Sequence, residues 1–347
     1  MSGVQHIAVA EDAADQRLDR WLRRMFPHVS QGRVEKMCRK GDLRVDKGRV
    51  KANTRLQPGQ VVRIPPLPEP GTVAAKPEAV ISDADAKLMQ DSVIYRDDDI
   101  IVLNKPAGLA VQGGSGQTRH IDGLADALRF GMETKPKLVH RLDKDTSGVF
   151  VMARTGRAAA GLAKSFHLRT TRKIYWAMVA GSPFPKMGTI RYGLVKAAGH
   201  GPNGAGERMH CIHPDAVEQT EGAKRATTDY AVIEAVGQRA AWVGLVPITG
   251  RTHQLRAHMA EIGHPIIGDG KYGTNSQVNE GDGWGAQLGG SVSRKLHLHA
   301  RSLAIPHPVS GAKMTFTAPL PDHMAQTWDF FGFDPAEAPT DPFEEQE

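Results

Sequence analysis

The sequence has little cysteine and no long apolar run, and both shortages exclude whole classes of protein. Only two of the 347 residues are cysteine, Cys38 and Cys211, and they provide neither a disulfide framework nor the spacing of a metal site, which fits a reducing compartment. No apolar stretch approaches the ~18 residues of a membrane-spanning helix. The first residues carry Glu11, Asp12 and Asp15, unlike a secretory signal or a transit peptide. We therefore expect a cytoplasmic protein with no membrane partner.

Acidic residues are outnumbered by basic ones in the chain as a whole but not at the C-terminus, where Lys and Arg are lacking. The chain has a formal net charge of +6 and a pI near 9.3. From residue 334 onward there are six acidic residues and no Lys or Arg, so the remainder carries +12. This excess indicates an anionic partner for the body of the protein. We expect the stretch 326–347 to be an acidic, disordered tail.

The segment 15–65 has the pattern of a small basic domain. Apolar residues at helical spacing predict a helix over 17–26, and Ser30 is placed to cap a second helix that Gly41 ends. Short apolar stretches around 43–50 and 61–64 predict a hairpin and a last strand. Between Arg17 and Arg63 there are 14 Lys or Arg and 4 Asp or Glu, a pattern typical of a phosphate-binding surface. The alternative is a basic face that serves only solubility.

Composition also sets the other domain boundaries. Residues 1–14 form an N-terminal arm, and the stretch 66–80, rich in Pro and Ala, has the composition of a semi-stiff linker. Residues 81–325 then form a large domain without an internal repeat. There we expect strands near 93–95, 100–103, 149–153, 173–179, 227–236, 241–246 and 314–317, helices near 121–130, 157–168 and 255–262, and loops over 196–222 and 278–293. This mixture predicts an α+β fold around a mixed or antiparallel sheet, preceded by the small α/β domain.

One polar stretch runs directly into a predicted core strand. Residues 140–148 are dense in charged and hydroxyl side chains and lead into the apolar stretch 149–153. A charged loop held at the end of a buried strand is a common place for binding or chemistry. Asp143 stands there between Arg141 and Lys144, and a carboxylate with positive neighbours can act as a general base or as a nucleophile. A surface turn with local ion pairs is the competing interpretation.

The stretch HRLDKDTSG, followed by VFVMA, resembles the signature of the RluA-type pseudouridine synthases. Four more stretches of that family's pattern occur in the same order, namely NKPAG at 104–108, KIYWA at 173–177, TGRTHQLR at 249–256 and GHPI at 263–266. The resemblance covers about 93–320, and QGGSG at 112–116 favours the RluC-like branch, which acts on large-subunit ribosomal RNA. RLDRWL at 17–22 and the hairpin sequence GDLRVDKGRV make 15–65 resemble an S4 RNA-binding domain.

The resemblance implies an isomerase that breaks the bond from ribose C1′ to uracil N1 and remakes it to C5, with no cofactor and no metal. It makes Asp143 the essential nucleophile or base, and leaves attack on the sugar and glycal formation both open. Arg256 is expected to be the bidentate partner of Asp143, ahead of Arg251. Tyr175 resembles the tyrosine that packs on the target base and takes part in C5 deprotonation. Alternatively it is a core aromatic beside Trp176, and on a strand only one of the two can face the site.

The expected partner is structured RNA, with large-subunit ribosomal RNA ahead of tRNA, bound by a monomer. Arg141 resembles the arginine that fills the place of the extruded base. In the large domain we expect further RNA contacts from His140, Lys173, Arg251, Gln254 and Lys105. For His140 a packing or hydrogen-bonding role is the expectation alongside, and we do not expect it to be a general acid. In the small domain we expect them from Arg17, Arg20, Arg33, Lys36, Arg39, Lys40 and Arg44.

Two other functions compete with this one. The pairs His253 with His258 and His297 with His299 have spacings that can bind a metal, as a hydrolase or nuclease would require, but no HExxH or CxxC accompanies them. A ribosome-assembly factor that binds RNA without chemistry is the second rival, and loss of the carboxylate at position 143 would be its sign. A separate hypothesis is that the acidic tail competes with RNA for the basic domain.

Overall fold

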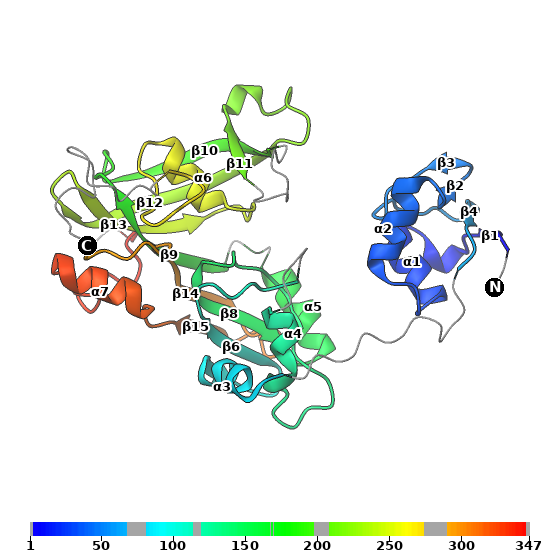
Figure 1. Ribbon diagram of the computed structural model, residues 1–347, viewed down its shortest axis with the longest axis horizontal. Helices are drawn as coiled ribbons and strands as arrows, with labels where there is room; N and C mark the ends of the chain where they lie inside the picture. The colour runs from blue at the N-terminus through cyan, green and yellow to red at the C-terminus, as the bar shows by residue number, and fades with distance from the viewer. Residues whose placement is uncertain are drawn as a thin grey trace. The chain divides into compact units, whose positions relative to one another are not determined.

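The chain divides into two compact units, Met1–Val80 and Ile81–Glu347 (Figure 1). The computed structural model describes residues 3–67, 81–113, 119–166, 168, 170–197, 208–273 and 290–344. The expected linker at 66–80 lies outside the described residues apart from its first two positions, and so does most of the expected loop at 278–293. Each unit is described by itself.

In the N-terminal unit, two helices pack on a four-stranded sheet of order β1-β4-β2-β3. Its elements are β1 (Gln5–Ala8), η1 (Glu11–Ala13), α1 (Leu18–Met25), α2 (Gln31–Lys40), β2 (Arg44–Val45), β3 (Gly48–Arg49) and β4 (Val61–Ile64). Ser30 caps α2 by accepting a hydrogen bond from the backbone N–H of Arg33, and Gly41 ends the helix in the left-handed conformation with φ 76°. Strand β1 pairs antiparallel with β4, so the expected N-terminal arm is part of this sheet.

The large unit is built on one mixed sheet of eleven strands. Its main path is β11-β10-β12-β13-β9-β14-β8-β6-β5, with β15 paired to β14 and β7 paired to β8. The strands are β5 (Val93–Arg96), β6 (Ile100–Lys105), β7 (Lys137–Leu138), β8 (Ser147–Ala153), β9 (Arg172–Ala180), β10 (Met187–Lys196), β11 (Met209–Ile212), β12 (Lys224–Val236), β13 (Ala240–Pro247), β14 (Leu298–Pro306) and β15 (Lys313–Thr317). The pairing of β8 with β14 is parallel and spans two residue pairs, whereas β9 pairs antiparallel with β14.

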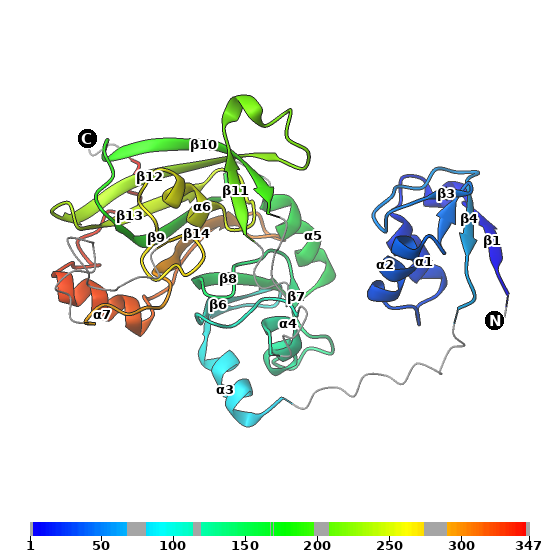
Figure 2. The ribbon, with the colours of Figure 1, turned by 45° about the horizontal axis from the view of Figure 1, so that its top comes forward.

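Helices cover both faces of this sheet. They are α3 (Asp83–Asp91), α4 (Ile121–Leu124), η2 (Ala125–Leu128), α5 (Gly156–Ser165), η3 (Pro214–Ala216), α6 (Gln254–Glu261) and α7 (Asp322–Phe331). Alternate residues of β6 and β8 pack on α3, α4 and η2 on one face and on α5 on the other. Alternate residues of β9 and β13 pack in the same way on α6 and on α7. Figure 2 shows α6 lying over β12 and β13, which it contacts together with β10 and β11.

Gly148 allows β8 and β14 to meet at the centre of the sheet. It has a φ of 108°, and a Cβ atom on it would lie 2.2 Å from the backbone oxygen of Ala300. The preceding Ser147 is buried and its Oγ lies 2.8 Å from Nδ1 of His299. The end of the signature stretch is therefore a packing requirement of the sheet, because only glycine has space there.

The structure corrects two of the expectations for loops. The stretch 196–222 contains β11, which pairs with β10, in addition to residues outside the described ranges. The tail expected to be disordered from residue 326 instead continues α7 and packs on the large unit through residue 344. Trp328 is 1% exposed and Phe333 is 5% exposed, and Arg172 forms a bidentate ion pair with Asp341. Both apolar residues of the tail and one of its acids, Asp341, therefore bind it to the large unit.

Candidate active site

Asp143 lies in the loop between β7 and β8, where it faces the first turn of α6. Its Oδ2 is 3.5 Å from Nη1 of Arg256 and 3.8 Å from Nε2 of His253. The Asp143 side chain is 17% exposed, whereas Arg256 and His253 are 6% and 9% exposed. The Asp143 carboxylate is thus partly exposed and faces two largely buried basic side chains.

Arg256 is held by Asp269 rather than by Asp143. Its Nε and Nη2 atoms each donate a 2.7 Å hydrogen bond to one oxygen of the Asp269 carboxylate. That carboxylate also accepts the backbone N–H groups of Lys271 and Tyr272. The expectation that Arg256 is the bidentate partner of Asp143 is therefore wrong, because the fork is used by Asp269 and only Nη1 faces Asp143. The pKa of Arg256 is raised: burial opposes the charge, but the Asp269 contacts outweigh it.

His253 is a member of this group that we did not predict. It precedes α6 with φ 51° and ψ 20°, a left-handed conformation that is uncommon for residues other than glycine. Its Nδ1 lies 3.1 Å from the hydroxyl of Tyr272, while Nε2 faces Asp143. Burial lowers the pKa of His253, so the imidazole is neutral at physiological pH. We had considered this residue only for metal binding.

Tyr175 stands on β9 with its side chain on the same face as α6. It packs on the two clusters that contain α4 and α6, whereas Trp176 packs on the cluster that contains α7. This confirms that the two aromatic side chains point to opposite faces. Burial and the nearby Asp143 raise the pKa of the Tyr175 phenol. The hydroxyl is therefore protonated near neutral pH.

Three residues expected to contact RNA are occupied inside the protein. Lys105 is fully buried, and its Nζ donates to the backbone oxygens of Pro106, Leu109 and Lys144 at 2.7 to 2.9 Å. Burial lowers its pKa to about 7, against the opposing effect of the acids at 145 and 143. By holding the carbonyl of Lys144, this lysine fixes the loop that carries Asp143. It has no free face for RNA.

Gln254 and His140 also serve the fold. The Gln254 side chain is 3% exposed and hydrogen bonds to Thr227, Thr228 and Thr249 as well as to the N–H of Arg251. The His140 ring lies 4.5 Å from each of the rings of Phe150 and Phe166, and its Nε2 accepts the N–H of Val151. Burial lowers the pKa of His140 to about 3, so this side chain is neutral.

Other expected RNA-binding residues remain at the surface. Arg141 is exposed and makes no side-chain hydrogen bond or ion pair with the described residues. Arg251 is exposed and donates to the backbone oxygen of Arg225. Lys173 is half-buried, with its Nζ 5.1 Å from the centre of the Phe166 ring.

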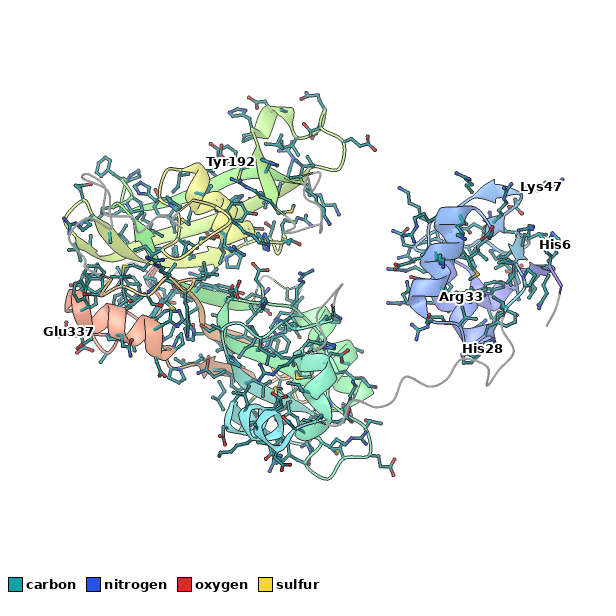
Figure 3. The ribbon with its side chains drawn as sticks, in the orientation of Figure 1. His6, His28, Arg33, Lys47, Tyr192 and Glu337 are labelled. Carbon is teal, nitrogen blue, oxygen red and sulfur yellow. The ribbon has the colours of Figure 1, made fainter. Side chains whose placement is uncertain are left out.

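In the N-terminal unit, some of the expected RNA-binding residues are bonded within the protein and others are exposed. Arg17 pairs with the buried Asp19, and Arg44 donates to the backbone oxygens of Gly41 and Lys47. Both guanidinium groups are used within the unit. The others are exposed, as Figure 3 shows for Arg33. They are Arg20, Arg33, Lys36, Arg39 and Lys40.

The described histidines do not form a metal centre. Both nitrogens of His297 are used, one by the carbonyl of Lys295 and one by Thr327. His299 bonds to Ser147 and to the carbonyl of Ala318. No group of three or more His, Cys, Asp or Glu able to bind a metal occurs in the described part of the chain.

Comparison with known proteins places this site in a family. A family model described as RNA pseudouridylate synthase matches residues 99–261, and an S4 domain model matches residues 16–62. The first match includes Asp143, Tyr175 and Arg256. The chain belongs to the RNA pseudouridine synthases, enzymes that isomerise uridine in RNA.

Individual relatives extend the match over nearly the whole chain. A ribosomal large subunit pseudouridine synthase C of Haemophilus influenzae is 36% identical over 332 residues, covering 93% of each chain. One of Vibrio cholerae with the same description is 34% identical and covers 93% of this chain and 95% of that protein. The solved structure of human RNA pseudouridylate synthase domain containing 4 is 29% identical, with a TM-score of 0.57 over 71% of this chain and 95% of that one.

Proposed function

We propose that this enzyme converts uridines of large-subunit ribosomal RNA to pseudouridine, with Asp143 as its essential carboxylate. The observation that carries this is the position of Asp143, partly exposed and facing Arg256 at 3.5 Å. The relatives support this substrate, because they are described as large-subunit ribosomal enzymes and match 93% of this chain. That substrate also supports the expected cytoplasmic location.

The reaction exchanges one glycosidic bond for another without a redox change. The bond between ribose C1′ and uracil N1 breaks, the uracil turns, and a bond between C1′ and C5 forms while C5 loses a proton. Asp143 acts at the ribose, either by attack at C1′ or by removing a proton to give a glycal. Arg256, fixed by Asp269, orients the carboxylate and offsets its charge near the RNA.

Tyr175 packs on the uracil in this scheme. A protonated phenol is a poor base, and both burial and Asp143 disfavour its anion. We therefore assign to Tyr175 the orientation of the turning base. Removal of the C5 proton falls to another group, and our candidate is Asp143, the carboxylate whose charge raises the pKa of Tyr175.

The target nucleotide must leave its stack before the ribose can reach Asp143. Extrusion costs a few kcal/mol. Arg141, which is exposed two residues before Asp143, is our candidate to occupy the vacated position. The exposed basic residues of α1 and α2 supply phosphate contacts that recognise RNA by shape.

The test is tritium release from C5-labelled RNA by the purified protein in EDTA. Large-subunit ribosomal RNA, small-subunit ribosomal RNA and tRNA are compared at equal concentration. Release from the large-subunit RNA alone is the expected result. Release from tRNA instead would overturn the substrate, and absence of release with tight RNA binding would favour an assembly factor. We expect a monomer, which light scattering of the free protein would test.

A further inference from the structure

Tyr272 connects every basic group that faces Asp143. Its hydroxyl lies 3.1 Å from Nδ1 of His253 and accepts a 2.8 Å hydrogen bond from the backbone N–H of Met209. The guanidinium carbon of Arg256 lies 5.3 Å from the centre of its ring, and that of Arg208 lies 5.5 Å from it. Tyr272 is 7% exposed. It is thus a fixed point between α6 and the start of β11.

The hydrogen bonds at Tyr272 favour one of the two tautomers of His253. The hydroxyl oxygen already accepts the N–H of Met209, so its own proton is available for the lone pair at Nδ1 of His253. Burial raises the pKa of Tyr272, which keeps that proton on the hydroxyl. A neutral imidazole that accepts at Nδ1 has its proton at Nε2. Nε2 is the nitrogen that faces Asp143.

The backbone of His253 fits a positioning role. The left-handed conformation is strained for a residue other than glycine, and such strain gathers at functional sites. The side chain forms no cap for α6. In this conformation Nδ1 of His253 meets the Tyr272 hydroxyl and Nε2 points to Asp143.

We propose that Tyr272 is a positioning residue that fixes the tautomer of His253, so that a neutral N–H faces the catalytic carboxylate of Asp143. This inference rests on the proposed function and adds two residues to it. At 3.8 Å the neutral N–H faces the carboxylate and leaves it charged, whereas an imidazolium would pair with it as an ion. Since Tyr272 also holds Met209, the position of β11 is linked to the state of the site.

The experiment compares Tyr272→Phe with Tyr192→Phe in single-turnover tritium release at saturating RNA. Tyr192 on β10, labelled in Figure 3, is the matched control. Its ring meets that of His258 edge-on, whereas Tyr272 contacts His253 and Arg256. Tyr272→Phe keeps the ring between the two arginines and removes only the hydroxyl. We expect the rate to fall about tenfold, the value of one hydrogen bond of about 1.4 kcal/mol, with unchanged RNA affinity. Tyr192→Phe should retain the wild-type rate.

The pH profile separates this role from a purely structural one. The charged or titratable groups around His253 are Asp143, Asp269, Arg256, Lys271 and Tyr272. Loss of the donor at Nδ1 makes protonation of His253 easier, so the acid limb of the rate should move to higher pH in Tyr272→Phe. In a His253→Gln background, where an amide N–H replaces the imidazole, Tyr272→Phe should cause no such movement.

Each outcome decides the matter. If wild type is active and Tyr272→Phe matches Tyr192→Phe in rate and pH profile, Tyr272 has no positioning role and the proposed function stands. If Tyr272→Phe lowers the rate equally with and without His253, the role does not pass through the imidazole, which also overturns the inference. If wild type itself releases no tritium, the proposed function fails first.

Discussion

The basic side chains of α2 stand at the surface of the N-terminal unit, whereas the charged groups around Asp143 are buried and paired within the large unit. Lys36 and Arg39 are exposed, whereas the Arg256 side chain is 6% exposed and donates two hydrogen bonds to the Asp269 carboxylate. Exposed charges contribute to RNA affinity in small, salt-dependent amounts. Buried charges fix geometry, and each is costly to remove. We therefore expect the same residue types to serve RNA binding in one unit and chemistry in the other.

Apart from loss of the Asp143 carboxylate itself, the largest expected effect comes from weakening the buried pair of Arg256 and Asp269. Arg256→Lys removes the fork that binds both oxygens of Asp269, and an ammonium cannot hold Asp269 and face Asp143 together. We expect a rate about 10²-fold lower in single turnover and a loss of about 3 kcal/mol in the free energy of unfolding. The control is Arg251→Lys, an exposed arginine five positions earlier. Equal rates for the two variants would show that the buried pair contributes no more to catalysis than an exposed arginine.

The buried histidines should make the large unit sensitive to acid. The pKa of His299 is lowered from 6.5 to about 4 by burial, so the unfolded state binds more protons between these values. Stability is therefore full above pH 6.5 and is lost as the pH falls toward 4. At pH 5 this one residue should cost about 2 kcal/mol. Unfolding in urea at pH 7 and pH 5 should show a smaller difference for His299→Gln than for wild type, and an equal difference would contradict the assignment.

A smaller effect is expected in the N-terminal unit. Lys36→Ala with Arg39→Ala removes two exposed charges of α2, so the slope of log affinity against log salt should fall by about two. The turnover rate at saturating RNA should not change. Arg44→Ala is the comparison, because its guanidinium already donates to Gly41 and Lys47. A larger slope change for Arg44 than for the α2 pair would reverse the distinction between exposed and occupied basic residues.

The smallest effect is expected in the C-terminal tail. Asp341→Asn breaks a pair with Arg172 whose side chains are 13% and 36% exposed, and we expect a loss of about 1 kcal/mol or less in stability. RNA affinity at low salt should stay the same, since Asp341 is held by the large unit. An increase in affinity would support the earlier hypothesis that the tail competes with RNA. Binding titrations of the full chain at low salt measure it.

The sequence predicted well what depends on local pattern. The apolar periodicity marked β8, β12, β13 and both helices of the N-terminal unit, because side-chain alternation is set by the backbone of the element itself. Family motifs located Asp143 and Tyr175, and strand geometry separated Tyr175 from Trp176. None of the described helices combines the length and apolarity needed to cross a bilayer.

What failed depends on contacts between distant segments. Composition predicted a disordered tail, but the rings of Trp328 and Phe333 both pack on the ring of Trp242 in β13. Asp269 was missed as the partner of Arg256 because either of two carboxylates could accept the fork. The charge of Lys105 suggested RNA, yet three backbone carbonyls surround its ammonium. Residue type alone does not predict whether a polar side chain bonds within the protein or contacts RNA at the surface.

The most direct measurement is tritium release by Asp143→Asn beside Asp145→Asn on large-subunit ribosomal RNA in EDTA. Both changes replace a carboxylate by an amide of equal size, but Asp145 is exposed and only Asp143 faces Arg256 and His253. We predict no release by Asp143→Asn with RNA affinity intact, and near wild-type release by Asp145→Asn. Release by Asp143→Asn at the wild-type rate would contradict the account at its centre.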